Sequence, residues 1–300
     1  MFKKLLIVFL LSVGLHATDV ADTEEDTNKV IAQSKQKLIE QFDIDGHSKQ
    51  TIAQIIDSSF NLRSYKENYF LPVSYRYNSE YVDGGAYEPH EAKDTETEFQ
   101  VSIRFDFGAN TLGLGEIYSF GYTQRSWWQV YVPSAFFRES NYQPEFFVTI
   151  PAYSFLGKSF VKGFKLALIH QSNGRGGEYE RSWNRASLST FFLFGNLITE
   201  LELWYRFHDK QDYNPDLLDY LGYGQLRFML PYKKHFFKLS LRSNLRYQKS
   251  AVEFMYTYPL PVGNEKNLFV ILKTFNGYGE SLIDYDHNVN KVSIGLAISR

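Results

Sequence analysis

Apolar and polar side chains alternate along most of the chain beyond Tyr69. Between Phe99 and Phe107, every odd-numbered residue is Phe, Val or Ile, whereas the residues between them are Gln, Ser, Arg and Asp. A two-residue repeat places one kind of side chain on each face of a β-strand. We therefore predict twelve strands, near residues 67–77, 96–108, 116–130, 142–154, 161–173, 183–195, 197–209, 219–230, 235–247, 249–259, 266–276 and 289–299.

This alternation fits two architectures: a soluble β-sandwich whose apolar faces point inward, and a membrane β-barrel whose apolar faces contact lipid. The barrel is favoured because the polar faces carry charges of both signs and the strand count is even. Tyr and Trp also gather at strand ends, as in an aromatic girdle; they are Trp127, Trp128, Tyr131, Trp204 and Tyr205. The predicted fold class is all-β, a twelve-stranded antiparallel transmembrane β-barrel.

The N-terminal residues indicate export. Lys3 and Lys4 precede the apolar run Leu5–Leu15, and a polar stretch follows Ala17. This order is typical of a secretory signal peptide, and the run is shorter than the about 20 residues of a membrane-spanning helix. A retained anchor is the alternative. We predict a signal peptide at 1–17, a short N-terminal periplasmic extension at 18–65 that is partly helical or disordered, and the barrel at 66–300, crossing the bacterial outer membrane many times.

The composition narrows the chemistry. Aromatic residues make up 17% of the 300 residues, and the net charge at pH 7 is −2. Mixed charges without a basic patch give no sign of a nucleic-acid partner. The absence of cysteine excludes a thiol nucleophile, a disulfide framework and thiolate zinc sites. Any metal ion must therefore be held by oxygen or imidazole ligands.

The segment from His170 to Arg185 lies between two predicted strands and has a glycine-rich centre. Residues two apart share a face of a strand, so His170 and Ser172 project side by side. If the hairpin closes symmetrically about Gly177, Asn184 lies opposite His170, with the side chains about 5 Å apart. Serine becomes nucleophilic when an imidazole takes its proton, and the imidazole needs an acceptor on its other nitrogen. We therefore predict Ser172 as nucleophile, His170 as base and Asn184 as the residue that orients the base.

These three side chains continue apolar rows. His170 and Ser172 follow Leu166 and Leu168 on one predicted strand, and Asn184 heads the apolar row of the next. The group therefore faces lipid, where polar side chains are costly and suggest function. At the membrane rim it would reach the ester bonds of phospholipids. A lone His near a strand end is more often a solvated residue, but the shared face with Ser172 and Asn184 reverses that interpretation.

Three ordered blocks of the sequence resemble the bacterial outer-membrane phospholipase A family. The first is the segment from His170 to Arg185, and the others are Tyr122–Tyr142, with Ser126-Trp127-Trp128-Gln129 and Phe137-Arg138-Glu139, and Gly277–Tyr285. The similar region runs from Asn68 to the end of the chain. The resemblance implies a calcium-dependent phospholipase of A1/A2 type, a serine hydrolase that acts on membrane phospholipids and lysophospholipids and is activated by homodimerisation.

The resemblance also implies a Ca²⁺ site at the dimer interface. Matched residue by residue, its oxygen ligands are the Arg175 carbonyl, Glu180 and Ser134 of the partner subunit, and oxygen suits this hard cation. Glu180 replaces a serine of the family, so it is either a carboxylate ligand or a solvated loop acid. Gly177 replaces an acidic residue of a second calcium site, whose companion would be Asp212; the alternative for Asp212 is an exposed loop acid.

Further roles are implied for Gln124 and Gly174. Gln124 matches a polar residue at the family's dimer interface, where an amide in lipid gains from pairing with its symmetry mate, although a lone Gln on a strand more often faces the lumen. The Gly174 region would supply backbone N–H groups to an oxyanion. Two other functions stay open: a passive pore with an incidental His-Ser-Asn cluster, and a non-catalytic family member with a structural or adhesive role.

Overall fold

The structure is a computed structural model that describes residues 62–77, 80–81, 92–157, 159–261 and 267–299, with a few isolated positions between 29 and 49. The predicted signal peptide and most of the predicted extension lie outside these residues. No helix in the described part is long and apolar enough to cross a membrane. The long strands are β2 (Tyr69–Arg76), β3 (Thr95–Ala109), β4 (Ile117–Gln129), β5 (Phe136–Pro151), β6 (Val161–Ser172), β7 (Ser182–Phe194), β8 (Leu197–Phe207), β9 (Gly224–Tyr232), β10 (His235–Asn244), β11 (Lys249–Pro259), β12 (Phe269–Gly277) and β13 (Val289–Ala297).

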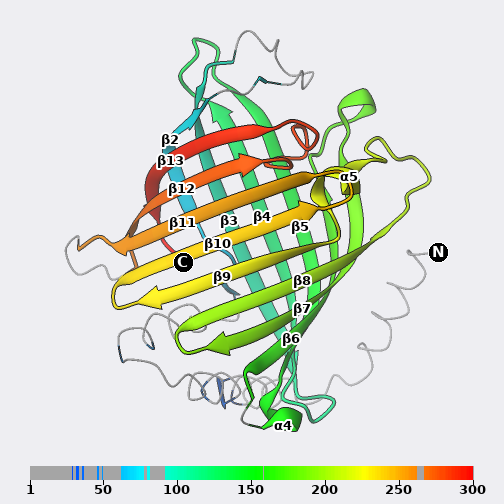
Figure 1. Ribbon diagram of the computed structural model, residues 1–300, viewed down its shortest axis with the longest axis vertical. Coiled ribbons are helices and arrows are strands. Elements are labelled where there is room, and N and C mark those ends of the chain that lie inside the picture. Colours follow the sequence, from blue (N-terminus) through cyan, green and yellow to red (C-terminus); the bar gives the residue numbers. More distant parts are fainter. Residues whose placement is uncertain are drawn as a thin grey trace, which may run out of the picture.

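These twelve strands close into a barrel in which every neighbouring pair is antiparallel (Figure 1). Closure occurs where β13 pairs with β2, for example Val292 with Tyr75. A closed sheet leaves no strand edge unpaired, as a lipid environment requires. The predicted all-β, twelve-stranded fold is therefore confirmed. Strands β2, β4, β6, β8, β10 and β12 all finish at the same end of the barrel, hereafter the loop end.

Two predicted strands have starts that differ from the structure by five residues or more, whereas the other starts differ by less. The fourth long strand, β5, begins at Phe136 rather than near 142, because Arg138 and Glu139 interrupt the sequence alternation yet are fully buried within the sheet. The predicted strand from 219 begins instead at Gly224, because α5 (Leu217–Leu221) precedes it. Leu217 and Leu221 lie one helical turn apart and pack with the indole ring of Trp204, which favours a helix over a strand.

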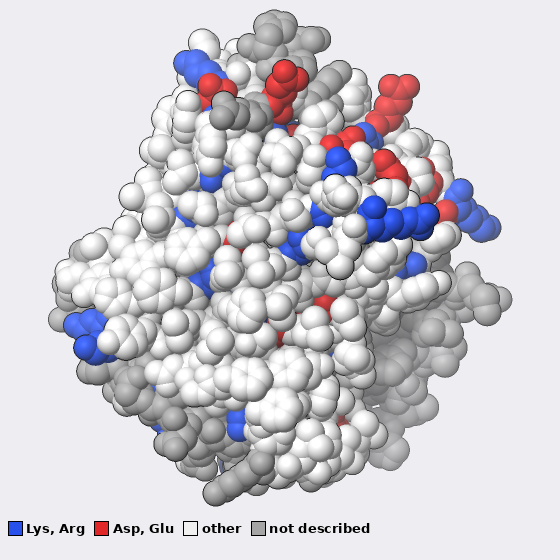
Figure 2. Space-filling model, in the orientation of Figure 1, with Lys and Arg blue, Asp and Glu red and all other residues white. Residues whose placement is uncertain are grey.

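The outer surface is apolar across the strands. Val101, Phe105, Leu168 and Ile294 are among the exposed residues, and charged side chains gather at the loop end in Figure 2. The aromatic prediction is wrong for two residues. Trp127 is fully buried and Trp204 is 9% exposed, because both occupy inward positions of their strands. They support the interior rather than an interfacial girdle.

The barrel interior is filled by paired charges. Lys291 reaches Glu96, Glu98 and Glu280, and Arg227 pairs with Glu200 and Glu202 at 2.8 Å each. Burying a charge is tolerated only when an opposite charge or hydrogen bonds compensate it. What remains is a cavity of about 540 Å³ among these side chains.

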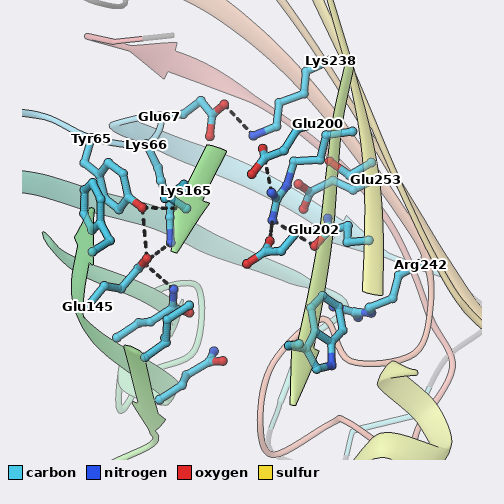
Figure 3. Close-up of a pocket in the computed structure, with 18 of the residues that line it drawn as sticks. Tyr65, Lys66, Glu67, Glu145, Lys165, Glu200, Glu202, Lys238, Arg242 and Glu253 are labelled. Atoms are coloured by element: carbon cyan, nitrogen blue, oxygen red, sulfur yellow. Dashed lines mark hydrogen bonds and ion pairs between the residues drawn. The ribbon is translucent and has the colours of Figure 1, made fainter. Parts of the chain in front are cut away.

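A short inward segment closes part of this interior. The three-residue strand β1 (Leu62–Ser64) pairs with β3, so the sheet begins upstream of residue 66. The next residues point into the cavity shown in Figure 3. The Tyr65 hydroxyl donates to Glu145 at 3.0 Å, Lys66 pairs with the same carboxylate, and Lys238 pairs with Glu67 at 2.6 Å. These contacts join the chain before β2 to strands β5 and β10.

Candidate functional site

Strands β6 and β7 carry the three predicted catalytic side chains. In their antiparallel register His170 pairs with Asn184, and Ser172 pairs with Ser182. Ala167 and Ile169 on β6 are buried toward the interior, whereas Leu166, Leu168 and His170 are exposed on the outer face. The alternation of β6 therefore places His170, and Ser172 two residues later, on the lipid-facing side near the loop end.

A hydrogen bond joins two members of the group. His170 Nδ1 and Asn184 Oδ1 are 2.9 Å apart. In the described part of the chain, Ser172 makes no side-chain hydrogen bond. Catalytic contacts are often long in a free enzyme and tighten when substrate binds. The other imidazole nitrogen of His170, Nε2, makes no hydrogen bond within the described residues.

The loop after Ser172 is held by one buried amide. Asn173 Nδ2 donates to the Tyr179 carbonyl at 2.9 Å, and its Oδ1 accepts from the backbone N–H of Arg181 at 3.0 Å. The short 3₁₀ helix η2 (Gly177–Tyr179) lies within the loop. Gly174 has a φ of 68°, and a Cβ there would lie 3.0 Å from the Tyr142 ring. Both the backbone conformation and the contact require glycine.

Gly174 also offers a free donor. Its backbone N–H makes no hydrogen bond within the described residues, although the neighbouring N–H of Arg175 donates to the Asn173 side chain at 3.3 Å. An N–H at this position can donate a hydrogen bond to a negatively charged oxygen. The predicted oxyanion donor therefore lies in a loop whose conformation is fixed by its neighbours.

The loop is also tied to the barrel interior. Arg175 Nε donates to Glu139 Oε2 at 3.2 Å, and Asn141 donates to the other oxygen of that carboxylate at 2.7 Å. Glu139 is fully buried. The site on the outer face is thus supported from inside the barrel by β5.

The three sequence blocks that carry the family resemblance meet at this end. Arg138 Nη1 lies 2.5 Å from Asp284 Oδ2, and Asn141 accepts from the backbone N–H of Leu282 at 2.9 Å. Burial by itself would raise the pKa of Asp284, but the guanidinium groups of Arg138 and Arg76 lower that pKa below its usual range. The β12–β13 connection therefore braces β5, which in turn holds Arg175.

The structure places the predicted calcium ligands in three loops. Arg175 and Glu180 belong to the β6–β7 loop, where the N–H of Glu180 donates to the Gly177 carbonyl at 3.1 Å. Ser134 is exposed in the β4–β5 turn. Asp212 lies in the β8–β9 connection, where Arg206 Nη2 contacts its two oxygens at 2.8 and 2.9 Å. No cluster of three His, Cys, Asp or Glu side chains suited to a metal ion occurs among the described residues.

Gln124 lies on the outer face of β4, in line with Ser172. Its amide accepts from the Tyr122 hydroxyl at 3.2 Å and donates to Ser126 Oγ at 3.3 Å. Gln124 pairs with Tyr142, and Tyr142 pairs with Ser172. The two residues are therefore two strands apart on one row, or about 10 Å at ordinary strand spacing.

Sequence reasoning missed one polar residue beside the group. Asn184 Nδ2 donates to both carboxylate oxygens of Asp209, at 3.1 and 3.0 Å. Asp209 follows β8, in which Phe207 pairs with Asn184. Because β8 ends at Phe207, the alternation of the strand does not extend to residue 209, and no sequence repeat indicates this contact.

Together, the closed barrel with an apolar outer surface and a filled polar interior defines a multi-pass protein of the bacterial outer membrane. The hydroxyl of Ser172, the imidazole of His170 and the amide of Asn184 lie at neighbouring positions of its outer face near the loop end. A family model described as phospholipase A1 matches residues 45–298. The chain belongs to the phospholipase A1 family, which confirms the resemblance found in its sequence.

Relatives support this assignment. A putative phospholipase A1 of Neisseria meningitidis is 33% identical over 253 residues, which cover 78% of this chain and 64% of that protein, so the chain spans less than two thirds of its length. Phospholipase A1 of Proteus vulgaris is 32% identical over 249 residues, covering 81% of this chain and 83% of the relative.

Two solved structures share the fold. The calcium-bound dimer of outer membrane phospholipase from Salmonella typhi has a TM-score of 0.72 at 28% identity, covering 83% of this chain and 97% of that one. Outer membrane phospholipase A of Escherichia coli has a TM-score of 0.71 at 29% identity, covering 80% and 99%. The predicted barrel and outer-membrane location are confirmed by these similarities.

Proposed function

We propose that this protein is a calcium-dependent phospholipase of A1/A2 type that hydrolyses the acyl esters of phospholipids and lysophospholipids by a Ser-His-Asn mechanism. The observation that carries the proposal is the 2.9 Å contact between His170 Nδ1 on β6 and Asn184 Oδ1 on β7. Ser172 lies two residues after His170 on the same face of β6. A hydrophilic reaction centre on a lipid-facing surface suits a substrate that is part of the membrane itself.

In this mechanism Asn184 fixes His170, which acts as general base. Asn184 Oδ1 accepts the hydrogen of Nδ1, so Nε2 carries the lone pair that removes the proton of Ser172. Ser172 Oγ forms a bond to the ester carbonyl carbon, and the carbonyl electron pair moves to its oxygen. The backbone N–H of Gly174 would donate to that oxyanion and stabilise it.

The intermediate then collapses to an acyl-enzyme. The bond between the carbonyl carbon and the glycerol oxygen breaks, and the leaving oxygen takes the proton from His170 Nε2. A water molecule, deprotonated by the same nitrogen, attacks the acyl group on Ser172. The products are a free fatty acid and a lysophospholipid, and the three side chains return to their starting protonation states.

Calcium fits the donors in the loops near Ser172. The Arg175 carbonyl and Glu180 belong to the loop whose conformation is held by the hydrogen bonds of the Asn173 side chain. Ser134 of the partner subunit would complete an oxygen ligand set. When bound there, the ion would supply positive charge near the developing oxyanion. The arginine contacts of Asp212 leave its oxygens engaged within the chain, which gives the second calcium site less support.

Homodimerisation is proposed for the face that contains Gln124. This amide shares a row with Ser172 through Tyr142, so a second barrel seated on Gln124 would also cover the space beside the nucleophile. An amide in lipid is stabilised by pairing with a polar partner. The Salmonella typhi relative forms a dimer with calcium, and the same assembly is proposed here.

The proposal is tested by fatty-acid release from phospholipid and lysophospholipid micelles, with calcium and with a chelator. Wild type should be active only with calcium, and Ser172→Ala should be inactive while keeping the circular dichroism spectrum of the barrel. Ser243→Ala, on the exposed outer face of β10, is the matched control and should retain activity. Hydrolysis by Ser172→Ala would remove the mechanism, and activity that survives the chelator would remove the metal assignment.

A further inference from the structure

Asn184 lies between two partners. Its Oδ1 is 2.9 Å from His170 Nδ1, and its Nδ2 lies 3.1 and 3.0 Å from the two oxygens of Asp209. The three residues come from β6, from β7 and from the connection after β8. Ser172 lies two residues after His170 on the same face of β6, so all four residues belong to one polar group on the outside of the barrel.

An amide is an ambiguous orienter of histidine. Rotation of the side chain by half a turn exchanges Oδ1 and Nδ2, and the NH₂ group would then donate to His170 Nδ1. That arrangement selects the tautomer with its hydrogen on Nε2. Such an imidazole has no lone pair facing the serine and cannot act as base. A carboxylate orienter does not have this problem, because it only accepts.

Asp209 removes the ambiguity. An ionised carboxylate has no hydrogen to donate, so only the NH₂ group of Asn184 can face it. The oxygen of Asn184 is then directed at His170, whose hydrogen must lie on Nδ1. Nε2 is thereby left unprotonated and available to Ser172. Since Asp209 is exposed, solvent screens its charge, and its main effect is through the direction of these hydrogen bonds.

We propose that Asp209 is a positioning residue that locks the Asn184 amide in its productive orientation and so sets the tautomer of His170. The inference rests on the proposed serine mechanism and adds a fourth member to it. Asp209 contacts Asn184 and makes no hydrogen bond with Ser172 among the described residues, so it acts through Asn184.

The first test is Asp209→Asn, measured by initial rates on phospholipid micelles at saturating calcium. We expect kcat to fall by about tenfold to a hundredfold, the range lost with a hydrogen bond to a charged group, with KM unchanged. Asp219→Asn is the matched control. It removes the same charge from the same β8–β9 connection, within α5, and its carboxylate makes no hydrogen bond or ion pair within the described residues. The control should keep wild-type rates.

The second test reverses the sign of the effect. In an Asn184→Asp background the orienter is a carboxylate that faces the carboxylate of Asp209, and two like charges at this distance repel. Adding Asp209→Asn to that background should therefore raise kcat, whereas the same change in wild type lowers it. A residue that merely supports the fold would lower kcat in both backgrounds.

The outcomes separate this inference from the mechanism beneath it. If Ser172→Ala keeps its activity, the serine mechanism fails whatever Asp209 does. If Ser172→Ala is inactive and Asp209→Asn matches wild type, only the role of Asp209 is overturned. A loss in both backgrounds also overturns it. A loss in wild type together with a gain in the Asn184→Asp background supports it.

Discussion

Glu139 accepts a hydrogen bond from Arg175 Nε at 3.2 Å, so a fully buried carboxylate inside the barrel holds the loop on its outer face. The Arg175 carbonyl is a proposed calcium ligand, and its position depends on this contact. The interior and the proposed reaction centre are therefore linked through Arg175, whose Nη2 also donates to the Arg138 carbonyl. The link makes interior mutations informative about the site.

Glu139→Gln should weaken calcium activation. Glutamine can still accept from Asn141 but no longer pairs with the Arg175 guanidinium, and removing a charged hydrogen-bond partner costs about 1.5–3 kcal/mol. We expect the calcium concentration for half-maximal fatty-acid release to rise about tenfold or more. Glu116→Gln, a buried acid in the β3–β4 turn at the opposite end, should leave the calcium requirement unchanged. An identical response in the two variants would contradict the link.

Much of the site could be predicted from local sequence, because a hairpin fixes its own register. The symmetric closure expected for the β6–β7 hairpin pairs His170 with Asn184, as the structure has it. Asp209 lies beyond the end of the next strand, where alternation no longer dictates direction. Its contact depends on the path of a connection rather than on a repeat.

The fold was predictable because a two-residue period is simple to read, but the period does not say which face is interior when both contain aromatics. Trp127 and Trp204 were expected at an interface and instead lie inside. Trp127 donates to Glu280 at 3.3 Å and Trp204 donates to the Gly222 carbonyl at 2.9 Å. Glu280 belongs to the β12–β13 connection and Gly222 to the β8–β9 connection, and the alternation within a strand reveals neither contact.

Asp284→Asn should make stability less sensitive to acid. Burial would raise the pKa of this carboxyl, but Arg138 and Arg76 lower it below the ordinary value of about 3.9. A lowered pKa gives stability that is complete above the unfolded value and is lost as the pH falls through the folded one. Wild type should thus lose this contribution only below about pH 4, whereas the variant lacks it at every pH.

At neutral pH the variant should be less stable by about 3 kcal/mol, because both arginines lose a partner that is itself fully buried. Urea unfolding in detergent micelles at pH 7, 5 and 3 measures the difference. The gap between the two proteins should narrow toward pH 3. A constant gap across that range would show that the carboxylate charge is not what stabilises the connection.

Gln124→Leu should weaken the proposed dimer without harming the barrel. An amide pair within a bilayer contributes about 0.6–2 kcal/mol, so the dissociation constant should rise by about threefold to thirtyfold. Sedimentation in detergent with calcium measures it. Thr274→Leu, a polar residue on β12 with a partly exposed position, is the control far from the proposed face. Equal dimerisation of wild type and Gln124→Leu would exclude this face.

The barrel should not conduct ions, which separates a phospholipase from a passive pore. The lumen is crossed by paired charges, and Tyr65 stacks on Phe147 with ring centroids 4.9 Å apart. We expect wild-type protein in planar bilayers to give no conductance steps, because ion passage would require breaking buried pairs that cost about 3–5 kcal/mol each.

The triple variant Tyr65→Ala, Lys66→Ala, Glu67→Ala removes the side chains of the inward segment. It deletes the contacts with Glu145 and Lys238 and widens the cavity, so it should show brief openings and a lower unfolding free energy. Steady conductance by wild type would favour the pore, since a segment that lets ions pass cannot be sealing the lumen. If the wild type gives no conductance and the variant opens intermittently, residues 65–67 seal the lumen. The barrel would then serve as a scaffold whose chemistry lies on its outer face.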